Sequence, residues 1–193
     1  MAFQSRDRDP LLDSETALTL ERRGRELMGL VLIGLGLLVG AMIATYSPDD
    51  PSILSPTNAP VTNLTGPIGA SIAAPLYMII GRASWTLALV PLVWGLRMVL
   101  HRAEGGIMGR LIFAPIWIAV CAIYASGVTA GPAWSHGFGL GGLFGDMMMG
   151  SILTALPLTA AVGLKVTQLV FALVLLALGA FVLGFDRRKN QLG

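Results

Sequence analysis

The sequence predicts an all-α integral membrane protein with four transmembrane helices and two short interfacial or re-entrant helices. Hydrophobic residues make up 54% of the 193 residues and charged residues only 12%, whereas soluble domains carry about 25% charged residues. Four apolar stretches are long enough to cross roughly 30 Å of hydrocarbon at about 1.5 Å per residue. Basic residues gather near the ends of these stretches, as is typical of membrane proteins.

The first predicted span, residues 27–44, follows a polar segment, residues 1–26. We expect this segment to be a cytosolic tail with a short amphipathic helix whose arginines lie among phosphate headgroups, and not a cleavable signal peptide. A disordered tail accounts equally well for residues 1–14. Small residues recur every four positions within the span, which predicts close packing against a helix of the same or a neighbouring protomer. These helix-packing residues are Gly36, Gly40 and Ala44.

Residues 45–67 carry five prolines, two aspartates and no lysine or arginine, so we expect an ordered or semi-ordered outer loop. Asp49 and Asp50 invite comparison with a cation site. Two adjacent acids before a proline are, however, more typical of a turn and a helix cap.

Residues 68–100 are apolar apart from two arginines, and a helix of that length would reach about 50 Å. Gly81 and Arg82 mark a natural break. The break leaves residues 68–80 as a short helix and residues 83–99 as the second span.

The third predicted span covers residues 111–128 and contains Cys121, which we expect to be a small buried residue. A second short apolar segment, residues 151–164, is interrupted by Pro157. The fourth span follows at residues 166–185.

Charge placement predicts the orientation of these spans. With the N-terminus in the cytosol and four crossings, eleven of the thirteen basic residues face inward, and only Arg82 and Lys165 lie outside. Residues 47–82 and 131–165 would then face the periplasm. The inward residues that we expect to set the topology, besides Arg6 and Arg8, are Arg22, Arg23, Arg25, Arg97, Arg102, Arg110, Arg187, Arg188 and Lys189.

Catalytic, cofactor and metal motifs are not recognised in the sequence. Gly137, Gly139 and Gly142 have the G-x-G-x-x-G spacing of dinucleotide-binding loops, but an uncharged apolar run precedes them instead of a strand in a βαβ unit. Neither lysine belongs to a P-loop. His101 and His136 lack the carboxylate spacing of a metal site. We therefore expect no catalytic, cofactor-binding or metal-binding residues.

Several short motifs resemble the N-terminal four-span membrane domain of the bacterial FtsK/SpoIIIE DNA translocases. They are "RELMGLVLIGLGLLVG" in the first span, "YSPDDPS" and "NLTGPIGASIA" in the first outer loop, "LVWGLRMVL" in the second span and "GGLFGD" in the second outer loop. Arg82 departs from the family pattern. We expect the outer loops to be shaped by Asp50, Pro51, Asn63, Gly66, Gly141, Gly142 and Gly145.

The resemblance implies a septal anchor in the inner membrane that oligomerises, as a hexamer in the family, contacts divisome membrane proteins and touches no nucleic acid itself. Residues 27–185 would form the membrane domain and residues 186–193 a cytosolic end. Because the chain ends eight residues after Phe185, we expect the family's motor domain to be absent from it. A small transporter or lipid-binding protein is the alternative, although a transporter normally keeps an ionisable group near mid-membrane.

Overall fold

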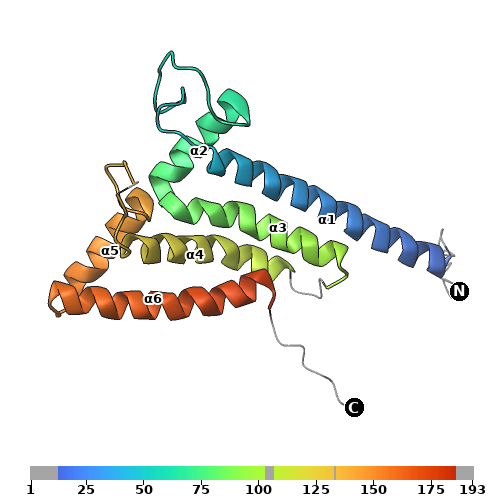
Figure 1. Ribbon diagram of the computed structural model, residues 1–193. Coiled ribbons are helices and arrows are strands. Elements are labelled where there is room, and N and C mark those ends of the chain that lie inside the picture. The colour runs from blue at the N-terminus through green and yellow to red at the C-terminus, as the bar shows by residue number, and fades with distance from the viewer. Residues whose placement is uncertain (1–12, 103–106, 133, 186–193) are drawn as a thin grey trace, which may run out of the picture.

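The structure, a computed structural model, describes residues 13–102, 107–132 and 134–185. Every regular element within these ranges is a helix, which confirms the all-α class (Figure 1). The elements are α1 (Ser14–Ala44), α2 (Gly66–Ile80), the 3₁₀-helix η1 (Gly81–Ser84), α3 (Trp85–Val99), α4 (Ile107–Ser126), α5 (Gly142–Ala155) and α6 (Ala160–Leu183).

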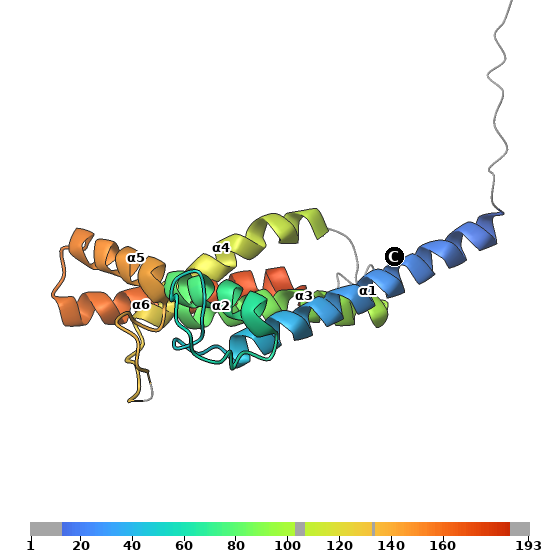
Figure 2. The ribbon, with the colours of Figure 1, turned by 90° about the horizontal axis from the view of Figure 1, so that it is seen from above.

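Helices α1, α3, α4 and α6 lie lengthwise beside one another, and α2 and α5 lie with both connecting loops at one end (Figures 1 and 2). We call this end the loop end and the opposite end, with the arginines of α1, α3 and α4, the basic end. Within the part of the chain that the structure describes, four stretches are long and apolar enough to cross a membrane, which confirms the predicted number of spans. They are Glu15–Ala44, Gly66–Val99, Gly109–Ser126 and Ala160–Leu183.

α1 is one uninterrupted helix of 31 residues, about 46 Å long. The expected boundary between a tail ending at residue 26 and a span beginning at residue 27 is therefore not a structural break. Leucine, glutamate and arginine favour helix, and ion pairs one turn apart, such as Arg25–Glu21, support the polar segment. As a result, the first turns of α1 extend beyond α3 at the basic end (Figure 2).

The break predicted at Gly81–Arg82 is present. Gly81 has a φ of 56°, a left-handed backbone that an L side chain rarely adopts. It is the first residue of η1, which precedes α3. The chain therefore turns between α2 and α3 and does not continue as one straight helix.

The predicted short segment at residues 151–164 is wrong in its boundaries. The short helix is α5, which starts at Gly142, and residues 160–164 already belong to α6. Pro157 explains the interruption, because the residue before a proline is pushed out of the α region. Leu156 accordingly has extended backbone angles and ends α5, and Thr159 precedes α6 in an extended conformation.

Two tryptophans connect the long helices in the core. The Trp94 indole N–H donates to the Val182 carbonyl oxygen at 2.8 Å, and the Trp117 indole N–H donates to the Leu175 carbonyl oxygen at 3.0 Å. Each bond satisfies an indole donor that would be costly to bury unpaired in hydrocarbon. Cys121 lies half-buried beside this core.

Candidate helix-packing and interface sites

α1 packs against α3 through backbone surfaces that glycines leave bare. A Cβ added at Gly29 would lie 2.8 Å from the Gly95 carbonyl oxygen, and one added at Gly95 would lie 2.5 Å from the Gly29 carbonyl oxygen. One added at Gly36 would lie 2.9 Å from the Ala88 carbonyl oxygen and the Leu92 nitrogen. No side chain fits at these positions without a backbone shift, so the backbones of the two helices are in van der Waals contact.

The residues expected to form this contact contribute unequally. Gly36 is buried in it, and a Cβ at Gly40 would lie 3.7 Å from the Ala88 side chain, an ordinary contact. Ala44 is exposed. A helix turns about 100° per residue, so Ala44 lies roughly 80° around the helix from Gly36, whereas Ile43 lies within about 20° of it. Ile43 is accordingly only 2% exposed.

The first outer loop folds around the carboxylate of Asp50. This side chain is 3% exposed and accepts hydrogen bonds from the Thr62 backbone N–H at 2.8 Å, the Thr62 hydroxyl at 2.7 Å and the Asn63 backbone N–H at 3.0 Å. Asp50 therefore joins the two ends of a proline-rich segment. The expected turn is present, with the Asp50 N–H donating to the Ser47 carbonyl oxygen, but Asp50 caps no described helix. Half-buried Pro51 follows it.

Asn63 holds the same loop onto α1. Its side-chain amide donates to the Met42 carbonyl oxygen at 2.9 Å, which is one of the carbonyls that a helix C-terminus leaves free. Its side-chain oxygen accepts from the Thr65 N–H and hydroxyl. Gly66 then starts α2 with a φ of 72°. The "NLTG" stretch is thus a structured junction between loop and helix.

Asp146 has the corresponding role in the second outer loop, and the sequence analysis missed it. Its carboxylate accepts from the Ser126 hydroxyl and from the Gly139 backbone N–H, both at 2.7 Å. The amide of Gly139 is the kind of donor that a dinucleotide loop would offer to a pyrophosphate. Here it binds a carboxylate of the same chain, whose negative charge would repel a phosphate.

The glycines of this loop allow backbones from both halves of the chain to meet. A Cβ at Gly81 would lie 2.6 Å from the Gly142 nitrogen, and one at Gly142 would lie 2.6 Å from the Gly81 nitrogen. Gly142 also has a φ of 69°. Cβ atoms at Gly141 and Gly145 would collide with the Ala122 carbonyl oxygen of α4. All four positions therefore favour glycine.

An aromatic cluster covers the loop end, and sequence patterns gave no signal for it. It joins the end of α1, α2 and the second outer loop, with ring centroids 4.4–6.1 Å apart. Arg82 adds a cation–π contact, 5.5 Å from the centroid of a tryptophan ring. Burial lowers the pKa of the histidine in the cluster below its usual range. The members are Tyr46, Tyr77, Trp134, His136 and Phe138.

The ends of α3, α4 and α6 meet at the basic end. The Arg97 guanidinium donates to the Arg102 carbonyl oxygen at 3.0 Å. Gly184 ends α6 with a left-handed backbone, and a Cβ there would lie 3.0 Å from Arg97 and 3.1 Å from Arg110. These arginines thus lie together, with Arg22, Arg23 and Arg25 on α1 at the same end. The predicted topology residues Arg187, Arg188 and Lys189 lie outside the described residues.

The helices, their apolar surfaces and their basic ends define a multi-pass α-helical membrane domain. The family model described as the 4TM region of DNA translocase FtsK/SpoIIIE matches residues 21–188. The chain therefore belongs to this family and is a multi-pass inner-membrane protein.

Several curated proteins named "DNA translocase FtsK" are similar to it. The one from Bradyrhizobium diazoefficiens is 38% identical over 134 residues, which cover 67% of this chain and 16% of that protein. The Azospirillum brasilense protein is 28% identical over 148 residues, covering 76% of this chain and 24% of the relative. The Caulobacter vibrioides protein is 29% identical over 160 residues, which cover 78% of this chain and 20% of that protein. The chain thus matches only a small part of each relative, and no solved structure matches it.

Proposed function

We propose that this chain is the inner-membrane anchor and assembly domain of a septal DNA translocase, acting in cell division and chromosome segregation without catalytic activity of its own. The observation that carries the proposal is the family match over residues 21–188, which coincides with the four long apolar helices. The relatives are named as DNA translocases, and the matched region is their membrane part. Residues 1–26, 27–185 and 186–193 would serve as tail, anchor and connecting end.

The proposed orientation has the basic end in the cytosol and the loop end in the periplasm. The arginines of α1, α3 and α4 support it, because basic residues next to membrane spans are retained on the cytosolic side. Arg82 and Lys165, at the loop end, are the described exceptions. Both chain termini would then be cytosolic.

We further propose that protomers assemble into a homo-oligomer, a hexamer by analogy with the family, and that the loop end contacts divisome membrane proteins. The proposed assembly rests on the family match; Leu169, Leu173 and Leu176 lie on one face of α6, are 60–67% exposed, and form an apolar surface that lipid or a neighbouring protomer can cover. The two loops closed by Asp50 and Asp146 offer an ordered surface to periplasmic partners. Nucleic acid would be handled by other parts of the translocase.

A fluorescent fusion to the chain tests the septal role. It should gather at midcell in dividing cells, and an even distribution around the membrane would contradict the proposal.

Native mass spectrometry of the detergent-purified chain should show an oligomer, whereas a monomer at every concentration would argue against assembly.

Nucleotide binding tests the proposed lack of catalysis. The purified chain should not hydrolyse ATP, because neither lysine belongs to a P-loop, and it should not bind NAD, because the Gly139 N–H already donates to the Asp146 carboxylate. Saturable micromolar binding that is lost in Gly139→Val would overturn this part of the proposal.

A further inference from the structure

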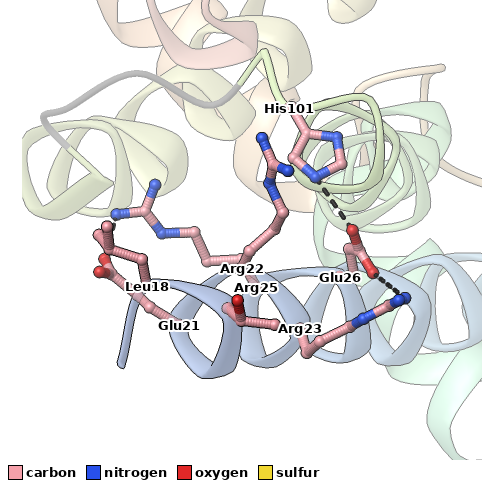
Figure 3. Close-up of a pocket in the computed structure, with 8 residues that line it drawn as sticks. Leu18, Glu21, Arg22, Arg23, Arg25, Glu26 and His101 are labelled. Atoms are coloured by element: carbon pink, nitrogen blue, oxygen red, sulfur yellow. Dashed lines mark hydrogen bonds and ion pairs between the residues drawn. The ribbon is translucent and has the colours of Figure 1, made fainter. Parts of the chain in front are cut away.

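A pocket of about 840 Å³ lies at the basic end between the first turns of α1 and the turn that follows α3 (Figure 3). Leu18 and Thr19 contribute part of its wall. The remaining lining residues are charged or titratable: Glu21, Arg22, Arg23, Arg25, Glu26 and His101. Three arginines and a histidine thus surround a cavity that contains two carboxylates.

Glu26 interacts with two of the other residues that line the pocket. Its carboxylate lies 3.0 Å from the His101 Nε2 and 3.2 Å from the Arg23 guanidinium (Figure 3), and its side chain is 25% exposed. His101 has a φ of 55°, a left-handed backbone that is uncommon for a residue with a side chain. Glu26 and His101 together connect α1 to the end of α3 and set the shape of the cavity.

The arginines remain available to a ligand. Arg23 and Arg25 form ion pairs with Glu26 and Glu21, but their side chains are 74% and 61% exposed. Exposed ion pairs contribute little to stability, so these guanidinium groups can exchange a carboxylate for another anion. Guanidinium forms paired hydrogen bonds with phosphate oxygens.

The depth of the arginines matches that of lipid phosphates. At about 1.5 Å per residue, Arg25 lies roughly 3 Å and Arg22 roughly 8 Å along the axis from Leu27, where the uncharged run begins. The polar layer on each side of the hydrocarbon is roughly 5–8 Å thick. A helix turns about 100° per residue, so the exposed Leu27, Leu30 and Val31 lie about 80–180° around α1 from Arg22 and Arg25. The face below the two arginines carries Gly29 and packs on α3, so the pocket contacts the headgroup while the acyl chains extend into the surrounding bilayer.

We propose that this pocket binds the phosphate headgroup of an anionic phospholipid, with Arg22 and Arg25 as the principal ligands. The site would fix the depth and tilt of α1 in the bilayer. It rests on the placement of α1 as a span and is independent of the septal role.

Native mass spectrometry of the whole purified chain tests the site directly. Detergent-solubilised protein is titrated with phosphatidylglycerol or with phosphatidylethanolamine of the same acyl chains. Wild type should bind phosphatidylglycerol more tightly. Arg22→Gln/Arg25→Gln should weaken that binding by about 30-fold, at roughly fivefold per basic residue. The matched control is Arg82→Gln/Lys165→Gln, which removes two exposed positive charges at the loop end and should leave binding unchanged.

Three results would overturn the proposal. They are an unchanged preference for phosphatidylglycerol in the pocket variant, an equal loss in the control, and displacement of the lipid by millimolar inorganic phosphate, which would make the site one for a free anion. The single variants Arg22→Gln and Arg22→Lys provide a second comparison, since Lys keeps the charge and should retain more binding than Gln.

Discussion

The contact between α1 and α3 makes a quantitative prediction for Gly36→Ala. The added methyl carbon would lie 2.9 Å from two backbone atoms of α3, the Ala88 carbonyl oxygen and the Leu92 nitrogen. Backbone atoms cannot move aside as a flexible side chain can, so the helices must separate. Overpacking of this kind costs about 1–3 kcal/mol. For a chain of this size, that corresponds to a thermal midpoint lower by roughly 2–12 °C.

Gly34→Ala is the matched control for this measurement. Gly34 lies on the same helix, and a Cβ there has nothing within 4 Å. Both substitutions share any gain in helix propensity, about 1 kcal/mol at most, so their difference isolates the packing term. Thermal unfolding in detergent, followed by tryptophan fluorescence, gives both midpoints. If Gly36→Ala is as stable as Gly34→Ala, close backbone packing does not hold this helix pair together.

Three further predictions concern the loop end. Asp50→Asn should destabilise the first outer loop by about 1.5–3 kcal/mol per hydrogen bond lost to the charged carboxylate, so proteases should cut this loop faster. The control Asp49→Asn changes an exposed side chain and should leave the rate of proteolysis nearly unchanged. Equal proteolysis rates for the two variants would contradict this. Gly142→Ala should lower the thermal midpoint, because Gly142 has a positive φ and no space for a Cβ. Gly137→Ala should not lower it, because a Cβ at Gly137 has nothing within 4 Å. Similar midpoints for the two variants would refute this prediction. Burial lowers the pKa of His136 below 6.5, so the unfolded chain binds the proton more readily and the loop loses stability as pH falls through the folded-state pKa. An NMR titration midpoint at or above 6.5 would disprove it.

Long-range composition was sufficient to predict the membrane fold. A span is an extended run of one residue class, so hydropathy and length identify it whatever its neighbours are. The break at Gly81 was also visible, because a glycine and an arginine interrupt an apolar run too long for one helix. The number of candidate spans in the described residues agrees with this reasoning, and the second of them, Gly66–Val99, combines α2, η1 and α3.

The error at the second short helix has a local cause. Residues 142–155 and 160–164 are similarly apolar, so hydropathy could not separate α5 from the start of α6. Pro157 predicts an interruption, and because a proline excludes the α conformation from the residue before it, the helix boundary lies at Leu156, which ends α5.

The helix contacts and the interface sites depend on tertiary structure. The sequence has 24 glycines, and spacing alone cannot show which of them face another helix. Four-residue spacing suggested Ala44, but the face is better described by seven-residue spacing, which joins Gly29, Gly36 and Ile43. Asp146 could have been noticed from its place after the glycine-rich stretch, as Asp50 was from its prolines. The pair of Glu26 and His101 brings together residues 75 positions apart, which a single sequence does not reveal.

Cysteine labelling tests whether the four crossings place the basic end in the cytosol and the loop end in the periplasm. Single cysteines replace Thr57, Glu104 or Ser135 in a Cys121→Ala background, and spheroplasts are treated with a membrane-impermeant thiol reagent. With the outer loops in the periplasm, intact spheroplasts should label positions 57 and 135, whereas position 104 should react only after lysis. Labelling of position 104 in intact spheroplasts, with positions 57 and 135 protected, would contradict it.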